Sequence, residues 1–183
     1  PRSLTTKNLR IGATDMRRMT LRVKKGFINL TEKESPLEED IELVSKENSL
    51  IMRLIGFFYP AFMKSLWTTI GDKIYYPTSV KSPLSARHFT TIKHEVVHVK
   101  QFKKYGVVLF FFLYLLCPLP FLFSYFRWKF EREAYLHANI KNEKDVDRVV
   151  DILGKYYLYP WPTKWMRKWF LEELESRKNG RHS

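Results

Sequence analysis

The chain is poor in cysteine: Cys117 is the only one among 183 residues, which limits its covalent chemistry. One cysteine cannot form an intramolecular disulfide, so the sequence gives no support for an oxidising compartment. Cys117 lies among apolar residues, where a small buried hydrophobic side chain is the simplest interpretation. The first residues, PRSLTTKNLR, also lack the apolar core of a secretory signal. We therefore expect a cytoplasmic or membrane-associated protein rather than one exported by a signal peptide.

Acidic residues are also scarce, above all near the N-terminal end, where Asp15 is the only one in the first thirty positions. The same stretch contains eight lysines and arginines, and the whole chain has a formal net charge of +13. Such an excess favours contact with anionic lipid or with nucleic acid. The sequence has no recognisable nucleic-acid-binding motif, so nucleic acid is the less supported partner. A solvated basic surface without a dedicated anion site also accounts for the charge.

Charged residues are absent from residues 107–126, VVLFFFLYLLCPLPFLFSYF, a run long enough to cross a bilayer as one helix. Pro118 and Pro120 interrupt the run, and proline breaks the hydrogen-bond ladder of a helix. We expect the chain to turn back at CPLP and form an apolar helical hairpin, whose arms are each too short to span a membrane. A single transmembrane span is the alternative. The hairpin and the basic arm are the expected contacts for an anionic membrane surface or an assembly partner.

Helical periodicity outweighs strand alternation along the rest of the chain, which predicts an α+β protein that is mainly helical. Residues 1–34 alternate weakly and fit a basic N-terminal arm or short strands. Ser35 as N-cap, followed by a proline and three acids, predicts a helix that runs to Phe58 or beyond, with a break near Asn48. Residues 73–76, KIYY, predict a short strand after a Gly-Asp turn.

The strongest chemical signal is HEVVH at residues 94–98, inside a helix predicted over residues 86–106. Residues four apart lie on one face of a helix, so His94 and His98 can direct their imidazole nitrogens at one cation. Glu95 lies beside them and can reach a metal-bound water, whose pKa zinc lowers towards neutrality. HExxH on a helix is a metalloprotease pattern. Two histidines that fall on one helical turn without a metal are the simpler alternative.

A catalytic zinc site needs a third protein ligand, and EREAY lies on a later predicted helix, at residues 131–135. HEVVH followed by EREAY resembles the glutamate-zincins, specifically the membrane-embedded zincin metallopeptidases that include the prenyl-protein peptidases. In that group HExxH is followed by ExEAD, whose first glutamate is the third ligand. The resemblance implies that Glu131 binds the metal, with Glu133 as the alternative ligand. Tyr135 stands where that group has an aspartate that supports a zinc-binding histidine, and His137 is expected to be an ordinary residue.

The arrangement of residues 67–137 is also similar to small HExxHxxQ proteins of bacteria and bacteriophages. These resemblances imply a zincin-like core with a short edge sheet, an active-site HExxH helix and the following apolar hairpin. The strand at 73–76 is expected to be the edge strand along which a substrate lies. The resulting organisation places a basic arm or short strands at 1–34, the zincin-like core at 35–160, and an amphipathic C-terminal helix and tail at 161–183.

Together these features predict a zinc-dependent metallopeptidase that hydrolyses bonds in a peptide or protein substrate. Glu95 is expected to act as general base and then as acid towards the leaving amine. Tyr135, Tyr105 and His88 are candidates for stabilising the oxyanion. The alternative is a structural or assembly component, such as part of a bacteriophage virion, that retains the zinc site without needing catalysis. A third alternative is attachment to a membrane or nucleic acid without chemistry.

Overall fold

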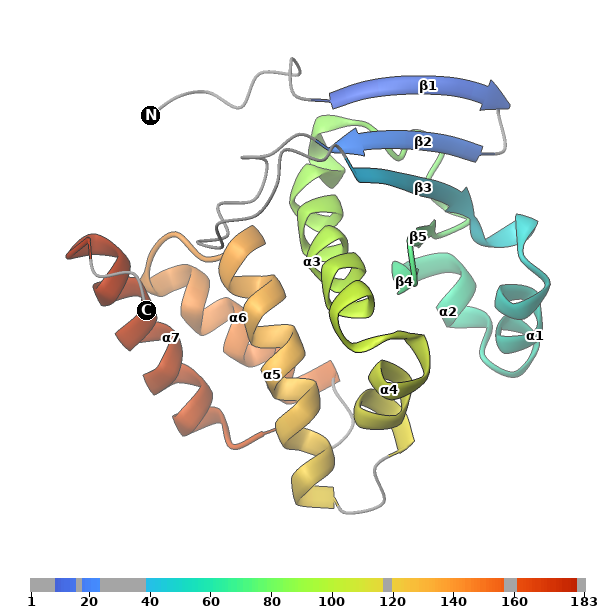
Figure 1. Cartoon of the computed structure of the whole chain (residues 1–183). Coiled ribbons are helices and arrows are strands. Elements are labelled where there is room, and N and C mark those ends of the chain that lie inside the picture. Colours follow the sequence, from blue (N-terminus) through green and yellow to red (C-terminus); the bar gives the residue numbers. More distant parts are fainter. Residues whose placement is uncertain (1–8, 16–17, 24–38, 117–119, 157–160, 181–183) are drawn as a thin grey trace. The chain divides into compact units, whose positions relative to one another are not determined.

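The computed structural model describes most of the chain and divides it into two compact units. The N-terminal unit is Pro1–Lys103 and the C-terminal unit is Lys104–Ser183. Within the described residues the chain is mainly helical with one sheet, so the predicted α+β, mainly helical class is confirmed (Figure 1). The described residues are 9–15, 18–23, 39–116, 120–156 and 161–180.

A five-stranded sheet belongs to the N-terminal unit. Its strands are β1 (Leu9–Asp15), β2 (Arg18–Val23), β3 (Glu39–Ser45), β4 (Thr68–Ile70) and β5 (Lys73–Tyr76). In space they follow the order β1-β2-β3-β5-β4, and all neighbours are antiparallel except β3 and β5. β1 and β2 confirm the short strands expected near the N-terminal end. β5 is the strand predicted at residues 73–76. It pairs with β3 on one side and with β4 on the other, so the expectation of an edge strand there is wrong. β4 lies at the edge instead.

Strand β3 corrects the helix that the sequence predicted from Ser35 onwards. The segment alternates: the side chains of Ile41 and Leu43 are fully buried, while Glu42 between them forms an ion pair with Lys73 at 3.0 Å. Burial of this period-two face within the sheet outweighs the local signals for a helix start. Ser35 itself lies outside the described residues.

Among the described residues, helical structure follows this strand, close to the break that the sequence predicted near Asn48. The elements are the 3₁₀ turn η2 (Lys46–Asn48), α1 (Leu50–Phe58) and α2 (Pro60–Ser65). The Ser49 hydroxyl caps α1, because it accepts a hydrogen bond from the Met52 backbone N–H at 3.4 Å. Pro60 occupies the first position of α2, where the missing N–H of proline removes no helical hydrogen bond.

Helix α3 (Phe89–Tyr105) carries HEVVH and confirms the helix predicted in this region. Its buried side chains Ile92, Val96 and Val99 repeat at helical spacing and pack against the sheet. Gly106 has a φ of 75°, a conformation that glycine adopts without steric cost, and it follows the end of the helix as predicted. The hydrophobic cluster that holds α3 to β3 and β5 comprises Ile41, Leu43, Ile74, Tyr76, Val80, Ile92, Val96 and Val99.

The C-terminal unit is helical throughout its described elements. These are α4 (Val107–Phe111), the π-helical turn η4 (Phe112–Leu116), α5 (Pro120–Ala138), α6 (Glu143–Tyr156) and α7 (Thr163–Lys178). The Phe110 ring lies 4.6 Å from the Phe130 ring, and Arg127 Nη2 donates to the Tyr114 carbonyl oxygen at 3.1 Å. These contacts hold α4 and η4 against α5, and the bend of the predicted hairpin at 117–119 lies outside the described residues. In the described parts, no helix combines the length and apolarity that a membrane crossing requires.

A second hydrophobic core joins α5, α6 and α7 within the C-terminal unit (Figure 1). Trp128 of α5 packs edge-on against Trp169 and Phe170 of α7. Phe170 is fully buried whereas Trp165 is 61% exposed, so α7 has a core face and a surface face, as expected of the amphipathic C-terminal helix. The core comprises Trp128, Leu136, Ile140, Val146, Val149, Val150, Leu153, Met166, Phe170 and Leu174.

Candidate metal centre

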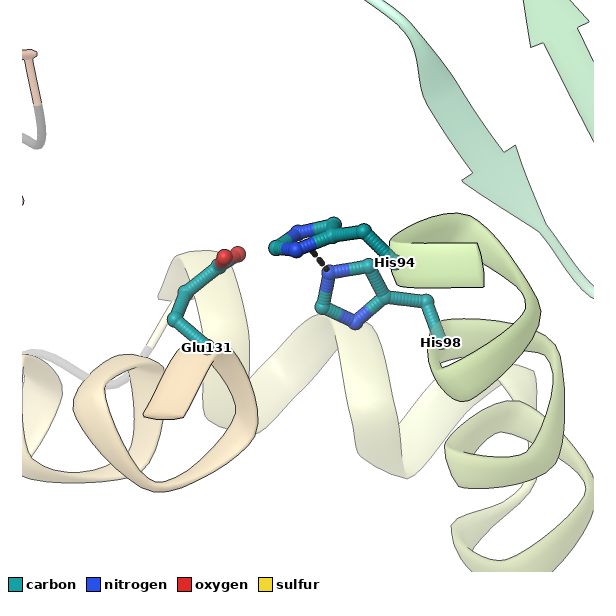
Figure 2. A group of neighbouring side chains, drawn as sticks. All are labelled: His94, His98 and Glu131. Atoms are coloured by element: carbon teal, nitrogen blue, oxygen red, sulfur yellow. Dashed lines mark hydrogen bonds between the residues drawn. The ribbon is translucent and has the colours of Figure 1, made fainter. Parts of the chain in front are cut away.

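The two histidines of HEVVH lie one turn apart on α3, with their ring centroids 4.9 Å apart (Figure 2). Their Nε2 atoms are 3.2 Å apart, and His94 and His98 are only 9% and 8% exposed. In a tetrahedral site, two nitrogens bound to zinc at about 2.0–2.1 Å lie roughly 3.3 Å from each other. Helix α3 therefore holds both imidazoles at the separation that a zinc ion requires.

Gln101, one turn further along α3, determines which ring nitrogen of His98 carries the proton. Its Oε1 lies 2.8 Å from His98 Nδ1, and it is almost fully buried. An amide oxygen only accepts hydrogen bonds, so His98 Nδ1 carries the proton and donates it. His98 Nε2 is then left with a lone pair, which is the form that binds a metal. This interaction gives the glutamine of the HExxHxxQ pattern a physical role.

The carboxylate of Glu95 is held by a strand of the same unit. Thr69 Oγ1 donates a hydrogen bond to Glu95 Oε2 at 2.6 Å, and both residues are buried. Thr69 is the central residue of β4, and its side chain points inward because side chains alternate along a strand. The sequence signalled an edge strand near the helix but gave no indication that Thr69 would bind Glu95.

Lys46, the first residue of η2, is a fully buried cation that interacts electrostatically with Glu95. Its Nζ donates to the Phe62 carbonyl oxygen at 2.8 Å and lies 3.3 Å from the centre of the Phe62 ring. Burial lowers the pKa of Lys46 from 10.5 to about 8, and the negative charge of Glu95 opposes part of that shift. Lys46 and Glu95 therefore form an electrostatically coupled pair of buried charges beside α3.

Glu131 is a buried carboxylate on α5, 2% exposed. Tyr114 of η4 donates its hydroxyl proton to Glu131 Oε1 at 2.5 Å. Arg127, one helical turn before Glu131, donates to the Tyr114 backbone oxygen and lies 5.1 Å from the Tyr114 ring. These contacts fix the orientation of Glu131 within the C-terminal unit. Glu133, the alternative ligand, is exposed on α5.

His94, His98 and Glu131 form a group that could hold a metal ion (Figure 2). One ligand atom from each residue can be chosen so that all three atoms lie within 4.8 Å of one another. Two imidazoles and one carboxylate match the donor set of a catalytic zinc site, which keeps a fourth position for water. The three residues singled out by HEVVH and EREAY are thus the ones that the structure groups together.

The other residues considered for the site have different surroundings. The Tyr105 ring lies 5.2 Å from the Phe130 ring, and Tyr135 packs against the hydrophobic core of the C-terminal unit. His88 ends the 3₁₀ turn η3 (Ala86–His88), and its Nε2 accepts a hydrogen bond from Arg87 Nε at 3.0 Å. Partial burial and the Arg87 charge lower the pKa of His88. The sequence did not point to Tyr114, whose hydroxyl donates a hydrogen bond to Glu131.

Each predicted ligand thus has an identifiable feature that positions it. Helical spacing determines the separation of the two histidines, and the hydrogen bond from the Tyr114 hydroxyl orients the Glu131 carboxylate. Comparisons with models of protein families, with curated proteins and with solved structures found no match to this chain.

Proposed function

We propose that the chain is a zinc-dependent peptidase in which His94, His98 and Glu131 bind the ion. The observation that carries the proposal is the group of three ligand atoms within 4.8 Å of one another. Nitrogen donors suit zinc, whereas calcium and magnesium take mainly oxygen ligands. The 3.2 Å separation of the two Nε2 atoms also fits tetrahedral coordination.

Glu95 is the residue to which we assign proton transfer. A bound zinc ion supplies Lewis acidity and lowers the pKa of water towards neutrality. Glu95 takes a proton from the attacking water as its oxygen bonds to the carbonyl carbon. Glu95 then returns that proton to the amine nitrogen as the carbon–nitrogen bond breaks. Because Thr69 donates to Oε2, we assign the transfer to Oε1.

Strand β4 supports a peptide as the substrate class. It is the terminal strand of the described sheet, and an extended peptide can pair with the backbone of such an edge. Thr69 lies on this strand and binds Glu95 directly, so a peptide added to β4 would lie beside the general base. This role belongs to β4 rather than to β5, for which the sequence predicted it.

The test is Glu95→Gln, which keeps the shape of the side chain but removes its ability to accept a proton. We expect zinc-loaded wild type to cleave an unfolded protein such as labelled casein, and the variant to be slower by about 100-fold or more. Zinc content should be equal in both proteins. Glu133→Gln is the matched control, because it makes the same change at an exposed position and should retain full activity.

Equal cleavage by wild type and Glu95→Gln would contradict the mechanism. Zinc-loaded wild type that cleaves neither casein nor a mixed peptide library would contradict the peptidase itself. Retained zinc in that case would support the structural or assembly role that the sequence left open.

A further inference from the structure

Helix α1 and the residue after it expose seven large apolar side chains, here named the α1 apolar surface. Phe57 and Phe58, at the end of the helix, are 79% and 78% exposed. Single exposed apolar residues are ordinary, but seven within ten consecutive residues form a patch of the kind that marks a contact site. The α1 apolar surface consists of Leu50, Ile51, Leu54, Ile55, Phe57, Phe58 and Tyr59.

This surface belongs to a helix that is firmly packed on its inner side. Met52 is fully buried, and Gly56 is buried one turn later. A Cβ atom at Gly56 would lie 2.2 Å from Met63 Cγ, so α2 packs directly against α1 at this glycine. The Thr78 backbone N–H donates to the Met63 carbonyl oxygen at 2.9 Å, which ties α2 to the segment after β5. The apolar side chains therefore point outward from an anchored helical pair, not from a frayed segment.

The charged residues of the segment that forms the α1 apolar surface are all positive, and the acid that precedes it along the chain is Glu47 in η2. Residues 49–66 contain Arg53 and Lys64, both exposed, and no acidic residue. An ordinary water-facing helix carries charges of both signs on its outer face, whereas a helix that lies in a lipid interface combines apolar and basic residues. Aromatic side chains such as those of Phe57, Phe58 and Tyr59 are also typical of that interface.

We propose that the α1 apolar surface docks into the interface of an anionic lipid membrane. The absence of acids from residues 49–66 and the chain's net charge of +13 complement a negatively charged bilayer. A second copy of the chain is a poorer occupant, because it would bring another +13 and the same basic residues to the contact. The sequence pointed to residues 107–126 and the basic arm for membrane contact, so this assignment names a different segment. It does not depend on zinc binding or on catalysis.

The test measures partition of the full chain onto vesicles of phosphatidylcholine with and without phosphatidylglycerol. We expect binding to the anionic vesicles only, weakened by at least about tenfold in the double variant Phe57→Ser/Phe58→Ser. Arg53→Glu/Lys64→Glu should weaken binding as well, with the loss greatest at low salt. Trp165→Ser is the matched control, since Trp165 is a large exposed aromatic residue in the C-terminal unit. Thermal unfolding and zinc content of each variant establish that it is folded.

Each alternative outcome would overturn the proposal. Equal binding to neutral and anionic vesicles would remove the electrostatic argument. Loss of binding in Val108→Ser but not in Phe57→Ser/Phe58→Ser would move the contact to the apolar hairpin, where Val108 is 84% exposed. Absence of vesicle binding, with a dimer in light scattering that Phe57→Ser/Phe58→Ser dissociates, would assign the surface to a second copy. If neither vesicle binding nor a dimer is detected, the α1 apolar surface does not have the proposed role.

Discussion

The candidate metal ligands of the two units are held within their own units by different means. In the N-terminal unit, His94, His98 and Gln101 lie on one helix, so helical spacing sets their mutual geometry. In the C-terminal unit, Glu131 is held by Tyr114, 17 residues earlier, and Tyr114 is bound in turn by Arg127. The histidine half therefore depends on local sequence, and the glutamate half depends on a folded hairpin. Substitution of a residue that supports the histidines should therefore change zinc affinity by a different amount from substitution of a residue that supports Glu131.

Gln101→Ala is expected to have the largest effect among the supporting residues. It removes the acceptor that keeps the proton on His98 Nδ1, and loss of such a partner typically weakens metal binding by about 10–100-fold. Competition with a fluorescent zinc chelator measures the change. Gln101→Glu is the control, because a carboxylate still accepts the proton and should preserve affinity. An unchanged affinity in Gln101→Ala would show that the tautomer of His98 is set by something else.

Tyr114→Phe tests the glutamate half and is expected to have a smaller effect, about tenfold in zinc affinity. The change removes the hydrogen bond to Glu131 Oε1 but leaves the ring and its contact with Arg127 in place. Tyr105→Phe is the matched control, because it removes a phenol hydroxyl from a ring that also packs against Phe130. Tighter zinc binding in Tyr114→Phe would mean that the phenol competes with the ion for the carboxylate, contrary to the supporting role assigned here.

Lys46→Met is expected to have the smallest effect, a change of about 1 kcal/mol in the free energy of unfolding. The size of this change should depend on pH. The folded-state pKa of Lys46 lies near 8 and its unfolded value near 10.5, so the cost of burying the charge is fully present below pH 8. Between pH 8 and 10.5 the unfolded chain binds more protons, and the wild type gains stability as the pH rises.

The methionine variant lacks that gain, so its stability relative to wild type should fall between pH 7 and pH 10. Urea unfolding at the two pH values measures the difference. Lys64→Met is the control, because Lys64 is exposed and has no buried charge to remove. A relative stability of Lys46→Met that is the same at both pH values would contradict the lowered pKa. Glu95→Gln should lower the pKa of Lys46 further, since it removes a favourable negative charge.

The histidine half could be predicted from the sequence because its geometry lies within one helix. The spacing of His94 and His98 fixes their common face, and the apolar stripe of α3 indicates which side is packed. Glu131 could be named only through a resemblance to a known family, since nothing local to EREAY indicates a metal ligand. The prolines in the apolar run predicted a turn, and the contact between η4 and α5 agrees with it.

Other features depend on contacts between distant residues, which no local pattern records. Thr69 and Glu95 are 26 residues apart, Tyr114 and Glu131 are 17 apart, and Lys46 lies 16 from its carbonyl partner. Strand β3 was predicted to be helical because its preceding cap and acids are local signals, whereas its sheet partners lie elsewhere in the chain. The sequence therefore predicted ligands but not the residues that orient them.

The central claim is that one zinc ion binds His94, His98 and Glu131, and metal analysis of purified protein tests it most directly. Wild type, His94→Ala, Glu131→Ala and Glu133→Ala are loaded with zinc, desalted and measured for zinc per chain. We predict about one equivalent in wild type and Glu133→Ala, and loss in the other two. Zinc that is retained at the wild-type level in Glu131→Ala, or absent from the wild type, would contradict the account.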